Sequence, residues 1–207
     1  LAFGNLIRPS DGHELNYIHV LFEWEQEPDA IGYNLQVSTQ PTFNNLLLDV
    51  NETTTVYIDK ENFNWNGNYY WRVRPVMDCD GCEYGNWIDA SSYSIGQISY
   101  QYIDTDIYQN DLLENGYVAI GGFSPEMYSV IIDNYGNEIW NNGDFQFLIN
   151  HINGDGNIFG FSDFDYPLNT GMKTNMDMDL VWSTMFPEPL DMHEFKQISN
   201  GNYMGFI

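Results

Sequence analysis

The sequence predicts an all-β protein, in which a β-sandwich is followed by an incomplete β-propeller. Three observations favour this fold class. Almost every apolar run alternates with other side chains at a period of two, as in a strand with one buried face. The runs are short, and the residues between them are Gly, Asn, Asp and Pro, which form turns. No stretch has the apolar spacing of a convincing helix.

The strand-like runs of residues 5–97 predict the sandwich. Val20–Trp24, Tyr33–Val37 and Tyr69–Val73 each alternate along the chain. Each run therefore predicts one strand with one face buried and the other mostly in contact with water. Turns such as Asn66-Gly67-Asn68 separate the runs. Short strands of this kind over about ninety residues are typical of two packed antiparallel sheets.

The same region shares a sequence pattern with a known family. The pattern consists of Pro9-x-Asp11-Gly12, Phe22-x-Trp24, Gly32-Tyr33-x-Leu35-Gln36-Val37-Ser38, Phe43, Tyr69-Tyr70-Trp71-Arg72-Val73-Arg74 and Trp87. Over residues 5–97 it resembles the fibronectin type III-like domains of bacterial surface and secreted proteins. Such domains usually act as spacers or adhesive modules. The resemblance implies that Trp24 and Trp71 pack in the core and do not form a ligand platform.

Residues 112–207 repeat. Gly116, Gly156 and Gly201 each belong to a turn before an apolar run and stand 40 and 45 residues apart, while Trp140 and Trp182 stand 42 apart. A period of this length with four short strands per unit predicts propeller blades. The region after the sandwich holds about two and a half blades of this size, and a closed propeller takes at least four. We therefore expect both ends of the sequence to be cut and the remaining blades to lie downstream, with residues 98–111 as a linker.

The charge of the chain excludes some partners. Six Lys and Arg stand against 30 Asp and Glu, a formal net charge of −24, which opposes binding to nucleic acid or to an anionic membrane surface. No window reaches the roughly 18 apolar residues of a membrane-spanning helix. We expect no nucleic-acid partner and no membrane insertion.

Cys79 and Cys82 are the only cysteines and stand in Cys-Asp-Gly-Cys. A second Cys or His pair for zinc is missing, as is the helix that follows a thioredoxin-type motif. We expect a disulfide across a hairpin end, which would stabilise the chain by roughly 2 kcal/mol. A disulfide favours an oxidising compartment, so the expected location is extracellular, cell-surface or periplasmic.

His193 is the candidate catalytic residue. It comes just before a predicted blade strand, and the inner strands of a propeller line the central channel. An imidazole there can act as nucleophile, acid, base or metal ligand. The alternative interpretation, that His193 is a structural histidine at the start of a strand, is equally favoured. His151 also follows its Trp by eleven residues, but on the glycine alignment it falls opposite Lys196, so we expect it on a hairpin surface.

The second half also shares a pattern with a family. An Asp133-x-x-Gly136-x-x-x-Trp140 hairpin is followed by His193-Glu194-Phe195 in a run that ends in Asn200-Gly201-Asn202. Over residues 112–207 this resembles the arylsulfotransferase-like propellers. The resemblance implies ping-pong transfer of a sulfuryl group from a phenolic sulfate ester to a phenol through a channel histidine, with no nucleotide donor or other cofactor. It makes His193 the nucleophile or a sulfate-binding helper, and Met192, where the family often has a second histidine, favours the helper.

Two functions from different classes remain open. One is a secreted arylsulfotransferase-like enzyme. The alternative is a non-catalytic cell-surface or adhesion protein whose propeller and fibronectin-like domain bind protein or glycan. From residue 98 onward Lys173 and Lys196 are the only Lys or Arg residues, so this stretch supplies little positive charge for an anionic substrate. The enzyme therefore requires further His and Arg residues from other blades.

Asn153-Gly154-Asp155-Gly156-Asn157 resembles part of a calcium-binding loop, because Asn and Asp oxygens alternate along it. The Glu that would complete such a loop is missing. We expect an Asx-Gly turn between strands and no metal site.

Overall fold

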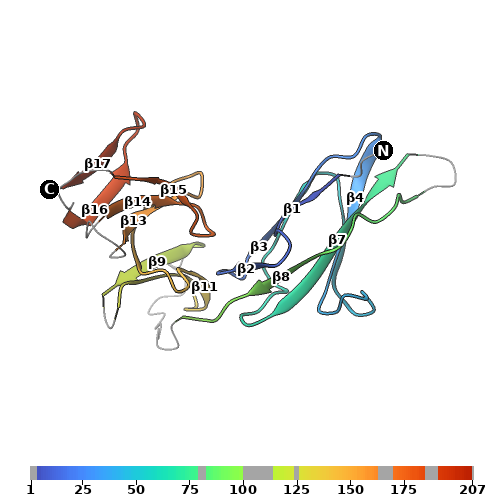
Figure 1. Ribbon diagram of the computed structural model, residues 1–207, viewed down its shortest axis with the longest axis horizontal. Helices are drawn as coiled ribbons and strands as arrows, with labels where there is room; N and C mark the ends of the chain where they lie inside the picture. Colours follow the sequence, from blue (N-terminus) through green and yellow to red (C-terminus); the bar gives the residue numbers. More distant parts are fainter. Residues whose placement is uncertain are drawn as a thin grey trace. The chain divides into compact units, whose positions relative to one another are not determined.

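The computed structural model describes residues 4–78, 83–99, 114–123, 126–162, 170–184 and 191–206. Every regular element in these ranges is a β-strand, so the chain is all-β as predicted (Figure 1). The chain divides into two compact units, Leu1–Gln97 and Ile98–Ile207. Among the described residues, no helix is long and apolar enough to cross a membrane.

The described part of the first unit forms two sheets. The three-stranded sheet has the order β1 (Leu6–Arg8), β3 (Val20–Trp24) and β6 (Val56–Asp59). The five-stranded sheet has the order β2 (His13–Leu15), β8 (Ser91–Ile95), β7 (Asn68–Met77), β4 (Ala30–Ser38) and β5 (Leu46–Glu52). Neighbouring strands are antiparallel except β2 and β8, which are parallel. The unit is therefore sandwich-like.

Aromatic side chains fill the core of this unit. Phe22 on β3 lies 5.2 Å from Trp71 on β7 between ring centroids, and the edge of one ring faces the other. Trp71 is fully buried, and its indole N–H donates to the carbonyl of Pro9 at 3.1 Å. Trp24 is buried against Tyr33, with centroids 5.5 Å apart. Both tryptophans are thus core residues.

The prediction that the polar side chains of β4 face water is wrong. Asn34, Gln36 and Ser38 are all buried, with exposed fractions of 4%, 8% and 0%. The amides of Asn34 and Gln36 accept hydrogen bonds from Arg74 and Arg72 on β7. Long side chains from the neighbouring strand therefore cover a face that local alternation assigns to solvent.

In the described residues of the second unit there are three antiparallel sheets, each built from strands that follow one another in sequence. The first has the order β11 (Glu138–Asn141), β10 (Tyr128–Asp133) and β9 (Tyr117–Gly122). The second has the order β12 (Phe147–Ile152), β13 (Ile158–Ser162), β14 (Thr170–Thr174) and β15 (Leu180–Ser183). The third pairs β16 (Asp191–Gln197) with β17 (Tyr203–Phe206).

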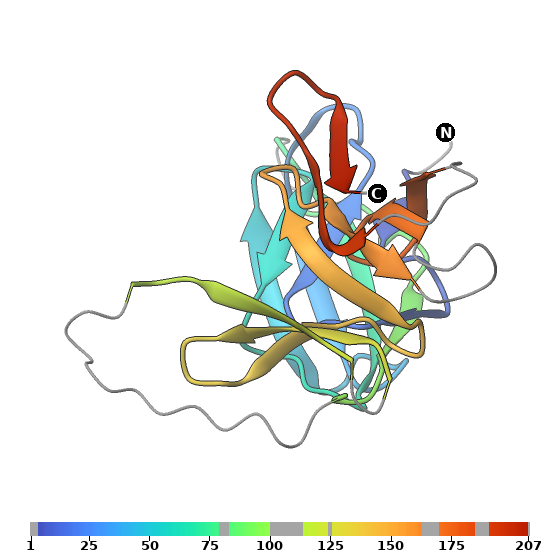
Figure 2. The same cartoon turned by 90° about the vertical axis from the view of Figure 1, so that its left-hand side faces the viewer.

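The sequence repeat places equivalent strands in the three sheets. Gly116, Gly156 and Gly201 precede β9, β13 and β17, and Trp140 and Trp182 lie on β11 and β15. β13 and β17 are therefore equivalent to β9. β12 comes just before β13, and β16 comes just before β17, so β12 and β16 are also equivalent to each other. None of the sheets closes on itself, and Figure 2 shows them separately in yellow-green, orange and red.

The three sheets pack against one another. The hydroxyl of Ser129 on β10 donates to the carbonyl of Phe147 on β12 at 2.7 Å, which joins the first sheet to the second. Phe159 and Phe161 of β13 pack with Phe195 of β16, which joins the second sheet to the third. All five residues of β13 are buried. A central strand covered on both faces is compatible with stacked blades of a partial propeller.

Most of the predicted linker 98–111 lies outside the described residues. Its beginning is held by Ser99, whose backbone N–H and hydroxyl donate to the carboxylate of Glu138 at 2.9 and 3.2 Å. Glu138 is buried on β11, where Asn141 also donates to its carboxylate. The first residues of the second unit are thus fixed to its first sheet.

Candidate functional site

His193 lies near the start of β16, next to Asp191. Its backbone N–H donates to Oδ1 of Asp191 at 2.8 Å, and its ring Nδ1 lies 2.6 Å from the same oxygen. An aspartate readily accepts a hydrogen bond from the N–H two residues further on, so the local sequence alone favours this arrangement. One carboxylate therefore holds both the backbone and the imidazole.

This pairing leaves the other side of the ring available. When Nδ1 carries the proton, it donates to Asp191, and Nε2 keeps a lone pair that can take a proton or attack an electrophile. Nδ1 and Asp191 are the only hydrogen-bonding or ion-pair contact of the His193 ring in the described part of the chain. Because the side chain is 80% exposed, Nε2 is open to solvent.

The hydrogen bonds also act on Asp191. They lower the pKa of its carboxyl group below the ordinary value, first through the backbone N–H of His193 and then through the His193 ring. Asp191 is therefore ionised at neutral pH and can stabilise a positive charge on the imidazole.

The two lysines of the second unit have partners elsewhere. Lys196 forms an ion pair with Glu194. Lys173 lies over the ring of Phe159, with its Nζ 5.8 Å from the ring centroid. Within the described ranges, no lysine or arginine forms a hydrogen bond or ion pair with His193. No group of three or more His, Cys, Asp or Glu side chains in these ranges is placed to hold a metal ion.

His151 lies on β12, and its ring centroid is 5.9 Å from the ring centroid of Phe159. In register, His151 pairs with Phe159 while Lys196 pairs with Met204. His151 precedes Gly156 by the same number of residues as Lys196 precedes Gly201, so His151 and Lys196 occupy equivalent positions in the repeat. His151 is exposed, in agreement with a position on the hairpin surface.

The loop with the partial calcium pattern is an Asx turn. The side-chain oxygen of Asn153 accepts hydrogen bonds from the backbone N–H groups of Asp155 and Asn157 at 3.1 and 3.0 Å. Equivalent bonds to Asn175 and Asp133 form the turns before β15 and β11. The prediction of a turn is confirmed. Cys79 and Cys82, the predicted disulfide, lie outside the described residues.

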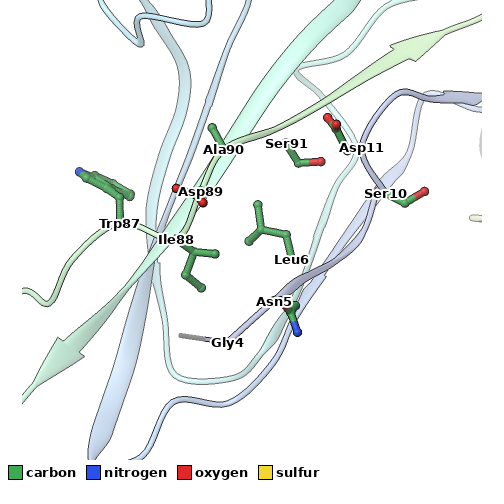
Figure 3. A pocket seen from close by; sticks show the side chains of 10 residues that line it. All are labelled: Gly4, Asn5, Leu6, Ser10, Asp11, Trp87, Ile88, Asp89, Ala90 and Ser91. Atoms are coloured by element: carbon green, nitrogen blue, oxygen red, sulfur yellow. The ribbon is translucent and has the colours of Figure 1, made fainter. Parts of the chain in front are cut away.

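Sequence reasoning missed a cleft in the first unit (Figure 3). The cleft has a volume of about 560 Å³. Its lining consists of Gly4, Asn5, Leu6, Ser10, Asp11, Trp87, Ile88, Asp89, Ala90 and Ser91. At one end, the carboxylate of Asp11 accepts hydrogen bonds from the backbone N–H and the hydroxyl of Ser92, which lower its pKa. The only lining residue that the sequence pattern had singled out beside Trp87 is Asp11, in the dipeptide Asp11-Gly12. This dipeptide indicates a turn and does not indicate a cleft.

Comparisons with protein-family models, with curated proteins and with solved structures found no match to this chain.

Proposed function

We propose that the second unit consists of β-propeller blades and that the chain is part of a secreted arylsulfotransferase-like protein. In this proposal the protein transfers a sulfuryl group from a phenolic sulfate ester to a phenol. The observation that carries the proposal is the pair of Asp191 and His193, whose ring is held at Nδ1 and open at Nε2. The resemblance of the run from His193 to Asn202 to that family agrees with it.

The proposed chemistry uses the open nitrogen. Nε2 of His193 attacks the sulfur, the bond between sulfur and the phenolic oxygen breaks, and the phenolate leaves. The acceptor phenol oxygen then attacks the sulfur, the bond between sulfur and Nε2 breaks, the phenol proton passes to water, and the neutral imidazole is regenerated. The carboxylate of Asp191 would stabilise the positive charge on the ring between the two steps. As a helper, a protonated His193 would instead bind the sulfate oxygens.

The packing of the second unit supports the propeller part of the proposal. Its sheets consist of antiparallel strands that follow one another in sequence, neighbouring sheets are in contact, and β12 and β16 each begin a sheet. In a propeller such strands line the channel, which would place His193 there. Since a closed propeller takes at least four blades, the proposal requires blades beyond these three sheets, and those blades would have to supply the cations for the sulfate.

The test is turnover of an aryl sulfate with a phenol acceptor by the complete protein. We expect His193→Ala to lose at least about 100-fold in turnover, because it removes the group that contacts the sulfate. The matched control is His151→Ala, which removes an exposed histidine from the equivalent strand β12 and should keep full turnover. Unchanged turnover in a folded His193→Ala protein would remove this residue from the site.

The two roles of His193 are separated by mass spectrometry after incubation with the donor alone. A sulfuryl group on a peptide that contains His193 would identify the nucleophile. A sulfuryl group on another histidine, lost together with turnover in the His193→Ala protein, would identify His193 as the helper.

One observation favours the alternative of a non-catalytic surface or adhesion protein. In the described part of the second unit, Lys196 is paired with Glu194 and no cation contacts His193. A complete, folded protein that binds a protein or glycan but turns over no aryl sulfate would establish this second function.

A further inference from the structure

The cleft of the first unit is enclosed by β1 and the turn after it on one side, and by residues 87–91, which lead into β8, on the other. The side chains of Leu6 and Ile88 lie between these two segments (Figure 3). Ile88 belongs to the buried core of the unit, and Leu6 packs against that core. The floor of the cleft is therefore apolar.

β1 leaves the backbone groups of one lining residue unpaired. β1 stands at the end of the strand order β1-β3-β6, so only β3 pairs with it. Leu6 lies opposite Trp24, and the bond beside this pair runs from the N–H of Glu25 to the carbonyl of Asn5 at 2.9 Å. In an antiparallel ladder this pattern makes Leu6 a non-hydrogen-bonded position, whose own N–H and C=O point away from β3. The sheet edge at Leu6 is therefore free to pair with another strand.

The facing wall offers the same groups at Ala90. Ser92 directs its C=O to the N–H of Gly12 and its N–H to the carboxylate of Asp11, each at 2.8 Å, and thus away from β7. Because these directions alternate along an extended chain, Ala90, two residues earlier, directs its N–H and C=O the same way. Ala90 is exposed and forms no backbone hydrogen bond within the described residues. An extended segment in the cleft would find donors and acceptors on both walls.

Two exposed carboxylates, Asp11 and Asp89, line the cleft. Neither forms an ion pair within the described ranges. Oδ1 of Asp11 accepts from the backbone N–H and the hydroxyl of Ser92, and these bonds lower its pKa, so the group is ionised at neutral pH. Together with the net charge of −24, the carboxylates favour a basic ligand and oppose a second copy of this chain.

Trp87 also lines the cleft, but its indole is not free to stack on a sugar ring. The guanidinium carbons of Arg72 and Arg74 lie 4.0 and 4.3 Å from the ring centroid. Two guanidinium groups above one face of an indole would collide, so they cover its opposite faces. A peptide needs no such platform, because its backbone pairs with the free groups of the two walls.

We propose that this cleft binds an extended basic segment of a partner protein, which pairs with the free backbone groups of Leu6 and Ala90. Side chains alternate along a strand, so one apolar side chain would face Leu6 and Ile88 while the Lys or Arg on either side of it face the carboxylates of Asp11 and Asp89. The site lies in the first unit and does not depend on the chemistry proposed for His193.

The test is a ¹H–¹⁵N NMR titration of the full chain with the peptide Ac-Lys-Val-Lys-Val-Lys-NH₂. We expect the backbone amide signals of Leu6 and Ala90 to shift saturably. Exchange of these amides with deuterium should slow at least about tenfold at saturation, because both N–H groups become hydrogen-bonded. No saturable shift at these two residues would overturn the proposal.

The other edge of the same sheet is the matched control. Val56 and Ile58 of β6 lie opposite Glu23 and Leu21, and the bond beside them runs from the N–H of Trp24 to the carbonyl of Thr55 at 3.1 Å. They therefore also hold non-hydrogen-bonded positions at a free edge. Their amide signals should stay in place. Equal shifts at both edges would contradict a specific site.

Two altered peptides separate charge from backbone pairing. Ac-Glu-Val-Glu-Val-Glu-NH₂ should bind at least about tenfold more weakly, because its charges repel the carboxylates of the cleft. The lysine peptide with both valines N-methylated should also lose at least about tenfold in affinity, because it lacks two of the N–H donors. Equal affinity of the glutamate peptide would overturn the choice of a basic ligand. Equal affinity of the methylated peptide would overturn strand pairing.

Substitutions in the chain complete the test. Asp89→Lys should weaken binding of the lysine peptide at least about fivefold, and Asp89→Asn should act in the same direction by less. Glu61→Lys makes the same change of charge at an exposed residue after β6 and should leave the affinity unchanged. Backbone amide signals report whether each variant is folded. Unchanged affinity in folded Asp89 variants contradicts the proposal. Shifts of the Leu6 and Ala90 signals with protein concentration, without peptide, would identify a second copy as the occupant and overturn it.

Discussion

The carboxylate of Asp191 shows how one short side chain can orient another. It accepts from both the backbone and the ring of His193, so the orientation of the imidazole is tied to the local path of β16. The sequence pattern identified His193 as the candidate, but its motif gave Asp191 no role. Periodicity and spacing do not indicate which acidic neighbour, such as Asp191 or Glu194, will form a hydrogen bond with the ring of His193.

The two hydrogen bonds at Asp191 can be separated by titration. We expect its pKa, followed by ¹³C NMR of the carboxyl group, to lie below the ordinary aspartate value and to rise only in part in His193→Ala. The larger contribution comes from the backbone N–H, which the substitution keeps. Asp11, whose lowered pKa depends on Ser92, is the internal control and should not move. A complete return of the Asp191 pKa to the ordinary value would contradict this assignment.

The sign of the effect on stability follows. The pKa of Asp191 is lower in the folded chain than in the unfolded chain. Ionised Asp191 therefore contributes stability above its unfolded pKa, and that contribution is lost as the pH falls through the folded pKa. It affects acid unfolding below about pH 4 and leaves stability near neutral pH independent of small pH changes.

Individual strands were predictable where local alternation decides burial. β3 and the centre of β7 alternate between buried and half-buried residues as the sequence indicates. β4 does not, because Arg72 and Arg74, almost forty residues further along the chain, cover its polar side chains. β13 is also buried throughout, and its Phe159 and Phe161 pack with Phe195 of β16, more than thirty residues further along the chain. Alternation describes a strand on its own, and these two strands take their burial from neighbours distant in sequence.

The tight packing of β13 makes a specific prediction for Gly160. A Cβ at this position would meet the backbone carbonyl oxygen of Leu148 and come within 2.6 Å of the ring of Phe147. We expect Gly160→Ala to lower the free energy of unfolding by about 1–3 kcal/mol, since the backbone of β12 must shift. The matched control is Gly154→Ala, which meets no atom within 4 Å and should change it by less than about 0.5 kcal/mol.

Chemical denaturation of the full chain, followed by circular dichroism, measures both variants. Equal stability of the Gly160→Ala and Gly154→Ala proteins would show that β12 and β13 are not held as closely as described.

At the scale of the whole molecule, the chain consists of two compact units with separate cores. Every residue of the first hydrophobic cluster lies between Leu6 and Ile95. The repeat in the second half was visible in the sequence because glycines and tryptophans recur at turns and strand ends. The cleft was not visible in the sequence, because its lining joins residues near Gly4 to residues near Ser91. The stacking of Arg72 and Arg74 on Trp87 was not visible either, because Trp87 follows them by more than ten residues.

Residues 1–97 should therefore fold by themselves. We expect this fragment to unfold in a single cooperative transition followed by tryptophan fluorescence, because Trp24 and Trp71 are buried in its own core. Trp71→Ala in the fragment should cost about 3–5 kcal/mol, since it leaves a cavity beside Phe22 and removes the donor to Pro9. A fragment whose tryptophan emission is already that of exposed indole in native buffer would show that the first unit depends on the rest of the chain.

The stacking of Arg72 and Arg74 on the indole of Trp87 has a consequence for how this protein can change by mutation. A single indole separates two cations, so the effect of losing one arginine depends on whether Trp87 is present. With Trp87 in place, replacing Arg74 removes an attractive contact; without it, the same replacement removes a repulsion between neighbours. These substitutions are epistatic and can differ in sign between backgrounds.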